Sequence, residues 1–397
     1  MREMKDSGVA WIGKIPHCWN TSKLKYLGQY INGYAFKPEE WGSKGVPIIR
    51  IQDLTGSNDN PNYFEGQIDK KYWVENGDIL ISWAATLDAF IWNKGNGWLN
   101  QHIFKAVPNR RIINYDFFFW MIKESMKNMN NDNKHGIFMQ HVTLSVFNNF
   151  TIPMPPLAEQ ERIAAFLDAE CAEIDTVLEK TRASIEEYKK LKQAVITQAV
   201  TKGIRGDRPM KDSGIEWIGD IPVEWDYTKA KNCVDIQNGS DPKTEGSIPV
   251  YGSGASSFKT CGEYKEGPSV LIGRKGATLH IPHYISTKFW NVDTAFNVYA
   301  KPNFDLKFYF YCACSFDYRF YISQTTLPSM TQTAYENMFL PLPSNDEQRA
   351  IASYLDNRCE EIDALIWKKQ ECLAEIENYK KSLIYEYVTG KKEVHPL

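Results

Sequence analysis

A long heptad pattern that occurs twice constrains this chain more than any other part of its sequence. From Leu167 to Ala199, mostly apolar residues recur at alternating spacings of four and three, which is the contact line of a coiled-coil helix. The pattern returns from Leu355 to Tyr387. Because each helix has one apolar stripe to bury, we predict that the two pack as an antiparallel pair of about 40 residues and about 60 Å each. The predicted contact positions are Leu167, Cys171, Ile174, Leu178, Thr181, Ile185, Tyr188, Lys192, Val195 and Ala199, and then Leu355, Cys359, Ile362, Ile366, Lys369, Leu373, Ile376, Lys380, Leu383 and Tyr387.

The segments around the two helices are duplicated as well. A proline-rich stretch precedes Glu159-Gln160, and a similar one precedes Glu347-Gln348. Prolines before the first turn and carboxylates within it suit the unpaired amides and the positive end of the helix dipole. The sequence MKDSGVAWIGKIP at residues 4–16 recurs as MKDSGIEWIGDIP at residues 210–222. The chain is therefore a tandem duplication, in which each copy holds one domain and one helix.

The intervening modules are predicted to be mixed α/β. Short β-branched runs at residues 79–81 and 270–272 read as strands, and residues 115–127 and 306–315 read as helices. We therefore expect an α+β fold of two mixed α/β domains separated by two long helices in an antiparallel coiled coil, with a pseudo-twofold internal repeat. The predicted segments are a first module at 1–151 with the repeated segment 4–19, a first helix at 152–204, a second module at 205–339 with the repeated segment 210–225, and a second helix at 340–397.

Composition narrows the class of protein. The 397 residues carry a net charge of −3, with the charges nearly balanced in the segments between the helices, so a nucleic-acid surface on this chain alone would bind weakly. The eight cysteines show no metal-binding spacing, and we expect reduced, cytoplasmic thiols. The sequence lacks an apolar run of about 18 residues, so we expect neither a signal peptide nor a membrane span.

Motifs that would indicate catalysis are absent from the sequence. It contains neither the glycine-rich dinucleotide motif nor the phosphate-binding loop, and it lacks the Asn/Asp-Pro-Pro-aromatic segment of amino-methyltransferases. An acid-x-Lys pair of the kind found in nucleases occurs at Glu263 and Lys265, with Asp241 upstream. Such pairs are common by chance, and the first module has no counterpart. His102, His280 and His283 are expected to be ordinary loop residues rather than metal ligands.

Polar loops at equivalent places in both modules indicate a different function. Their amide, guanidinium and imidazole groups can pair with base edges in the major groove of DNA, and cations between glycines suit a close approach to phosphate or guanine. We therefore predict a DNA-facing edge on each module. Its candidate residues are Arg50, Gln52, Ser82, Trp83, Thr86, Asn100, Gln101, His102, Lys134, His135, Gln140 and His141 in the first module, and Lys243, Arg274, Lys275, Thr278, Ser329, Thr331 and Gln332 in the second.

The full order of these motifs resembles the DNA specificity subunit of type I restriction-modification systems. The two passages from proline segment to Glu-Gln helix, at 152–168 and 340–356, are its most specific marks. The resemblance implies two target-recognition domains, each reading one half of a bipartite asymmetric site on double-stranded DNA. It also implies that the helices fix the spacer and dock two methyltransferase subunits, which a restriction/translocase subunit joins.

The same resemblance places the cofactors on the partners. S-adenosylmethionine, Mg and ATP are expected there, and this chain is expected to be non-catalytic, to bind no cofactor and to contact no membrane. Two alternatives from other classes stay open at this point. One is a single-chain site-specific endonuclease. The other is a coiled-coil scaffold that binds proteins, either as a partner platform or by pairing two copies of the chain.

Overall fold

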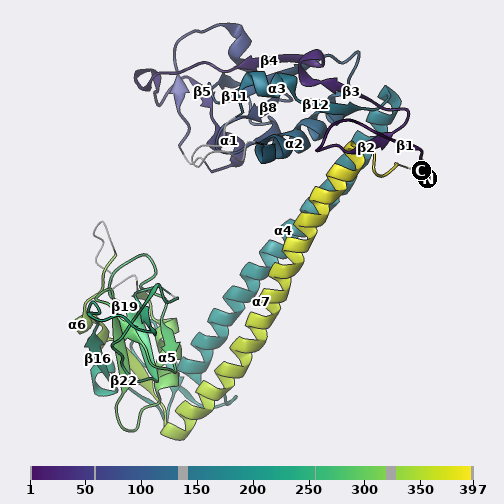
Figure 1. Ribbon diagram of the computed structural model, residues 1–397. Coiled ribbons are helices and arrows are strands. Elements are labelled where there is room, and N and C mark those ends of the chain that lie inside the picture. Colours follow the sequence, from purple (N-terminus) through teal and green to yellow (C-terminus); the bar gives the residue numbers. More distant parts are fainter. Residues whose placement is uncertain (1, 58–59, 133–141, 255, 319–327, 395–397) are drawn as a thin grey trace. The chain divides into compact units, whose positions relative to one another are not determined.

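The computed structural model describes residues 2–57, 60–132, 142–254, 256–318 and 328–394. It contains two compact units, one made of Met1–Lys180 with Leu373–Leu397 and the other of Thr181–Cys372. Each unit holds one sheet-containing module and one part of each long helix (Figure 1). The duplication in the sequence thus corresponds to two units in the structure, each made of one module and parts of the two long helices.

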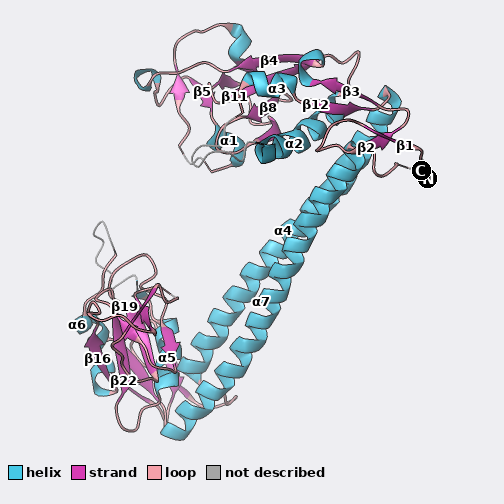
Figure 2. Ribbon diagram, viewed as in Figure 1, coloured by secondary structure: helices cyan, strands magenta, loops and turns pink. Residues whose placement is uncertain are grey.

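The first module is built on two four-stranded sheets. Its strands and helices are coloured by type in Figure 2. In the antiparallel sheet, Phe104 is paired with both Asn32 and Ile81 on the neighbouring strands. Phe117, Phe118 and Met121, which belong to the helix α2, are part of the same buried core as this sheet. The first sheet has the order β4 (Gly28–Asn32), β11 (Ile103–Pro108), β8 (Ile79–Ser82), β9 (Asp88–Ile91); the second has the order β6 (Tyr63–Phe64), β5 (Val46–Ile49), β10 (Gly97–Leu99), β7 (Trp73–Val74). The module's helices are α1 (Ile51–Thr55), α2 (Tyr115–Asp132) and α3 (Leu144–Asn149).

The second module repeats this plan. Phe296 is paired with both Asn238 and Ile272, so it occupies the position of Phe104. In each module the second sheet also contains one parallel pair, β5 with β10 and β17 with β21. The first sheet has the order β16 (Val234–Asn238), β22 (Ala295–Ala300), β19 (Ser269–Gly273), β20 (His283–Ile285); the second has the order β18 (Lys259–Cys261), β17 (Ile248–Tyr251), β21 (Trp290–Asn291). The helices are α5 (Leu306–Ser315), with the bounds predicted from the sequence, and α6 (Gln332–Asn337).

Short two-stranded ladders attach each module to its long helix. The repeated segments form hairpins, β1 (Met4–Asp6) with β2 (Lys14–Pro16) and β13 (Met210–Asp212) with β14 (Asp220–Pro222). The proline segments, predicted as the lead-in to the helices, are strands: β12 (Thr151–Met154) pairs with β3 (Asn20–Lys23), and β23 (Phe339–Leu342) pairs with β15 (Asp226–Lys229). Proline is tolerated in these ladders because each strand has a free edge that needs no amide donor. The predicted borders at 152 and 340 therefore fall inside strands. Single 3₁₀ turns occur at Leu24–Tyr26, Pro38–Glu40, Lys70–Tyr72 and Ala230–Asn232.

The heptad prediction is confirmed by α4 (Leu157–Lys202) and α7 (Asn345–Val388), because every predicted contact position is buried or half-buried. In the first unit, Lys380 Nζ lies 2.5 Å from Asp175 and the rings of Phe166 and Tyr387 are 4.4 Å apart. The second unit contains the ion pair between Lys192 and Asp363, at 2.6 Å. There Lys369 also lies 5.5 Å from the ring centre of Tyr188. Residue numbers rise along one helix as they fall along the other, so the helices are antiparallel within each unit.

Buried carboxylates fix the start of each long helix to its module. The indole of Trp19 donates to Glu159 at 2.9 Å, and the indole of Trp225 donates to Glu347 at 2.8 Å. Arginines supply the counter-charge, Arg2 for the first glutamate and Arg208, at 2.7 Å, for the second. The neighbouring glutamines, Gln160 and Gln348, each accept from a module backbone amide at 2.8 Å and donate to a proline carbonyl at 2.9 Å.

This network gives a prediction for Glu347→Gln. The Arg208 guanidinium would lose a buried counter-charge, so the free energy of unfolding of the second unit should fall by about 2–4 kcal/mol. Urea unfolding followed by tryptophan fluorescence measures the change. Asp346→Asn, one residue earlier, removes an exposed carboxylate that pairs with Arg349 at the surface; it is the matched control and should change the free energy of unfolding by less than about 1 kcal/mol. Equal losses from both variants would contradict the role given to Glu347.

Candidate nucleic-acid interface

Five of the predicted residues of the second module meet around one cleft of about 250 Å³. They come from two places, the turn after β19 and the segment that leads into α6. The wall is completed by Asn238 at the end of β16 and by Phe296 on β22. The predicted residues in the cleft are Arg274, Lys275, Ser329, Thr331 and Gln332.

Backbone contacts hold the two sides of this cleft together. Met330 N donates to Arg274 O at 2.9 Å, and Lys275 forms an isolated bridge with Ser329. Gly276, at φ +116°, donates to the carbonyl of Pro328 at 3.0 Å, and a backbone with that dihedral angle favours glycine. The guanidinium of Arg274 lies 5.9 Å from the ring centre of Phe296. The turn therefore presents one cation over an aromatic floor.

Several predicted residues of this module form local hydrogen bonds, and two of them, Thr278 and Lys243, do not line the cleft. Thr331 caps α6 by accepting from Ala334 N at 3.1 Å. The amide of Gln332 donates to Ile236 O at 3.1 Å and accepts from Asn238 at 3.1 Å. Thr278 donates to the carbonyl of Ser253 at 2.9 Å. The backbone of Lys243 donates to Glu263 at 2.7 Å, while its side chain is exposed.

The first module has Trp83 at the position of Arg274. Phe104 and Phe296 hold equivalent positions in the two sheets. Trp83 follows β8, the strand that pairs with Phe104, and Arg274 follows β19, the strand that pairs with Phe296. Trp83 stacks on Phe104 at 5.8 Å and donates to Asn32 at 3.3 Å. The ring of His102 lies 5.4 Å away, and Gln101 is within 3.4 Å of that imidazole. The two modules thus share a frame in which an aromatic surface in one replaces a cation in the other.

Three predicted residues of the first module lie in other surroundings than the open loops expected from the sequence. Ser82 is buried and donates to Ala84 O at 3.1 Å, so it closes the turn. Asn100 is buried too, and its backbone amide donates to Ile49 O at 3.2 Å. Gln52 lies in α1 rather than in a loop, because Asp53 accepts from Arg50 N at 2.8 Å and starts a helix.

The remaining predicted residues of this module divide into two groups. Arg50 stays half-buried, 5.4 Å from the ring centre of Trp41, and Thr86 is exposed. Lys134, His135, Gln140 and His141 lie outside the described residues.

The nuclease-like pair is occupied by structural contacts. Glu263 accepts from the amides of Lys243 and Thr244 and from the Thr244 hydroxyl, and these hydrogen bonds, the hydroxyl's first, lower its pKa to about 2. Lys265 donates to Asn291 at 2.8 Å and Asn297 at 2.6 Å, and burial lowers its pKa. Glu263 and Lys265 thus hold neighbouring loops and strands. In the part of the chain that is described, no group of three or more His, Cys, Asp or Glu could hold a metal ion.

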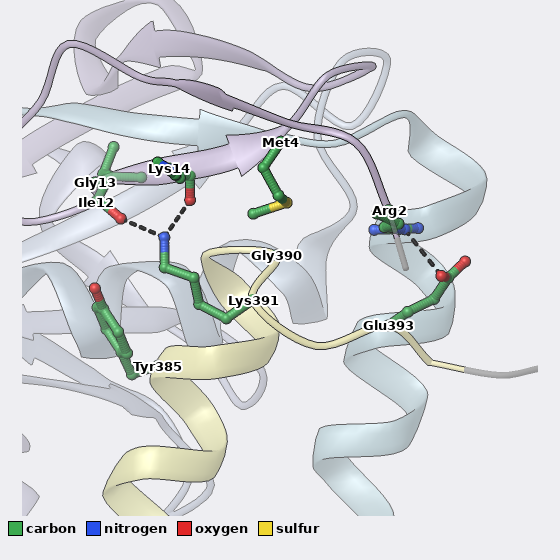
Figure 3. A pocket seen from close by; sticks show the side chains of 9 residues that line it. All are labelled: Arg2, Met4, Ile12, Gly13, Lys14, Tyr385, Gly390, Lys391 and Glu393. Atoms are coloured by element: carbon green, nitrogen blue, oxygen red, sulfur yellow. Dashed lines mark hydrogen bonds and ion pairs between the residues drawn. The ribbon is translucent and has the colours of Figure 1, made fainter.

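A larger pocket, of about 740 Å³, lies where the β1–β2 hairpin meets the end of α7 (Figure 3). Lys391 reaches back from beyond Gly390 and donates to Ile12 O at 2.6 Å, and burial lowers its pKa. Arg2 pairs with Glu393 at 3.1 Å. None of the predicted nucleic-acid residues lines this pocket. It is a junction between the two ends of the described chain.

Comparison with a family model matches most of the chain. The model describes the type I restriction modification DNA specificity domain, and it matches twice, at residues 16–187 and 222–375. Each match covers one module and the part of a long helix that follows it in sequence. The family model therefore matches each copy of the duplication in this chain once. Among the described residues, none of the helices is long and apolar enough to cross a membrane.

Curated relatives align over nearly the whole chain. The Type I restriction enzyme EcoBI specificity subunit of Escherichia coli is 24% identical, over 98% of this chain and 90% of that protein. The MjaVIII specificity subunit of Methanocaldococcus jannaschii is 26% identical, over 97% and 95%. A solved chain described in terms of complex assembly and conformational transition of the type I R-M system has a TM-score of 0.73 at 18% identity, over 95% of this chain and 99% of that one. The HsdS subunit from Thermoanaerobacter tengcongensis gives a TM-score of 0.50 at 18% identity, over 95% and 98%.

Proposed function

Because this chain belongs to the family of the type I restriction modification DNA specificity domain, we propose that it is the sequence-specific DNA-binding subunit of a type I restriction-modification complex. Each module reads one half of a bipartite asymmetric site on double-stranded DNA. The observation that carries this proposal is the pair of equivalent positions, Trp83 over Phe104 and Arg274 over Phe296. One frame with two different half-buried groups at the same position suits two half-sites of different sequence.

The charge of the chain supports a role within a larger complex. A net charge of −3 supplies little of the phosphate attraction that dominates DNA affinity, so partners must add cations. We propose that two methyltransferase subunits dock on the long helices and bring S-adenosylmethionine, and that restriction/translocase subunits bring Mg and ATP. The chain itself is non-catalytic in this proposal. Its curated relatives, which are named specificity subunits, support this division of labour over a single-chain endonuclease or a scaffold.

The function is tested by gel shift and by methylome sequencing. The purified chain should transfer no methyl groups, should shift DNA weakly, and should shift its target strongly once a methyltransferase partner is added. Cells with this chain and that partner should carry methylated adenines in one bipartite motif that disappears when the chain is deleted. Methyl transfer by the partner-free chain, or an unchanged methylome after deletion, would overturn the proposal.

Arg274→Ala tests the reading position of the second module. A guanidinium that pairs with a base contributes about 1–3 kcal/mol of discrimination, so the complex should lose that much affinity for its target and little for unrelated DNA. Lys231→Ala is the matched control. It removes an exposed cation from the 3₁₀ turn before β16, whereas Asn238 at the far end of that strand lines the cleft. Filter-binding titrations at fixed salt measure both variants. An equal loss on target and unrelated DNA would assign Arg274 to phosphate contact instead.

A double insertion tests whether helix length sets the spacer. Seven residues added after Ile185 in α4 and seven after Leu373 in α7 keep the heptad contact line in phase. They lengthen each helix by about 10.5 Å, which corresponds to about 3 base pairs at about 3.4 Å each. The methylated motif should keep its half-site bases and gain spacer, or methylation should stop where the added rotation of the duplex is not absorbed. Active enzyme with the original spacer would show that the helices do not measure the site.

A further inference from the structure

One backbone contact defines equivalent positions beside the turns of Trp83 and Arg274. In the second module, the amide two residues before Gln332 donates to Arg274 O at 2.9 Å. In the first module, the amide two residues before Leu144 donates to Trp83 O at 2.8 Å. In both modules the residue in between is a threonine that caps the short helix that follows. Leu144 therefore holds the place from which Gln332 lines the cleft of the second module.

The exchange of Gln332 for Leu144 is coupled to the exchange of the turn residue. In the second module, Gln332 accepts a hydrogen bond from Asn238 at 3.1 Å. The equivalent asparagine of the first module, Asn32, instead accepts from the indole of Trp83 at 3.3 Å. The asparagine is thus bonded in both modules although its partner differs. Because the indole replaces the glutamine as its partner, a leucine can stand at the glutamine's place.

The first module therefore offers an apolar surface where the second offers polar groups. Leu144 is 37% exposed, and Trp83 is half-buried with its indole N–H bonded inside the module. Two polar residues near Trp83, Gln101 and His102, lie within 3.4 Å of each other. Of the groups that base pairs present in the major groove, only the C5-methyl group of thymine is apolar. A leucine at a reading position thus distinguishes thymine from the other three bases by that methyl group.

We propose that Leu144 is a specificity-determining residue that contacts the C5-methyl group of one thymine in the half-site read by the first module. The inference rests on the proposed function, in which each module reads one half-site. Trp83, on the turn beside Leu144, supplies the second apolar wall of this contact. The first half-site is thus read in part by burial of a methyl group, whereas the second is read by the guanidinium of Arg274.

Replacement of thymine by deoxyuridine tests this contact, because it removes the methyl group and keeps every hydrogen-bonding group of the base. The full-length chain, combined with its methyltransferase partner, is titrated in filter-binding assays at fixed salt with duplexes that carry the motif found by methylome sequencing. Each thymine of the motif is replaced in turn. One replacement should weaken binding about 3- to 10-fold, the value of one buried methyl group. It should not lie in the half-site where Arg274→Ala lowers discrimination.

Leu144→Ala assigns that thymine to this side chain. The variant complex should bind the unmodified duplex about 3- to 10-fold more weakly. It should also lose the difference between thymine and deoxyuridine at that position, because the two changes remove the same contact.

Val146→Ala is the matched control. It shortens a second exposed side chain of α3, which lies two residues further along and so faces another side of the helix. The equivalent residue of the second module is Ala334, which does not line the cleft. This variant should keep the wild-type affinity and the full difference between thymine and deoxyuridine.

The outcomes separate this inference from the proposed function. If no deoxyuridine replacement weakens binding, or if the difference persists unchanged in Leu144→Ala, the inference fails while target binding by the complex upholds the function. A half-site of the first module without thymine in either strand, or a loss from Val146→Ala equal to that from Leu144→Ala, would also overturn the inference. A wild-type complex that binds the motif no better than unrelated DNA would overturn the proposed function itself.

Discussion

The buried carboxylate at the start of each long helix is the interaction on which both units depend. A carboxylate taken out of water must be matched by hydrogen bonds and an opposite charge, otherwise its burial is strongly destabilising. Glu159 and Glu347 meet this demand with an indole from the module and an arginine from the segment before the repeated hairpin. One side chain therefore ties three parts of the chain together at the helix start. Geometry that strict explains why Glu-Gln stands in the same place in both repeats.

Aromatic and polar partners extend this anchor along the first turns of the helices. Trp120 of α2 donates to Asp168 at 2.7 Å, and Tyr311 of α5 donates to Asp356 at 2.7 Å. The two aspartates occupy equivalent places in the repeat, while their donors differ in kind. The carboxylate is kept and its partner is exchanged, because an indole and a phenol can both bring one donor from a buried ring. Each module is thus fixed to its helix at two successive levels.

The sequence alone was sufficient to predict the arrangement of the two long helices and the two repeated units. Heptad spacing predicted the antiparallel helices, and the repeated segments predicted two equivalent units, because both signals come from periodicities that burial enforces. The α5 helix was predicted with its bounds, since an apolar stretch follows the capping Asp305. The proline segments were harder, because a strand with a free edge and an extended lead-in have the same residues. Strand pairing partners, which are distant in sequence, decide between the two.

The candidate site was predicted only in part, for a physical reason. Polar side chains in turns can either face a ligand or satisfy the local backbone, and the sequence does not distinguish the two uses. Ser82 and Asn100 satisfy the backbone, and Thr331 caps a helix. Arg274 does both, because its guanidinium donates to the carbonyl of Asp293 at 3.4 Å and also lines the cleft. Trp83 was predicted as one of a group of polar loop residues, whereas in the structure its ring stacks on Phe104.

The modules have diverged as coupled sets of residues rather than one position at a time. In the first module, Lys105 on β11 donates to Asp78 at 2.6 Å and to Trp73 O at 2.9 Å. The equivalent position on β22 is Asn297, and the cation comes instead from Lys265, which donates to Asn297. In both modules a half-buried ammonium forms hydrogen bonds inside the module, although a different segment supplies it and its partners differ. Moving either lysine alone would leave a buried charge or a buried amide without its partner. Under the proposed function, specificity should therefore change by exchange of a whole module or of the half-buried group at Trp83 or Arg274, because the groups beneath them are bound to one another.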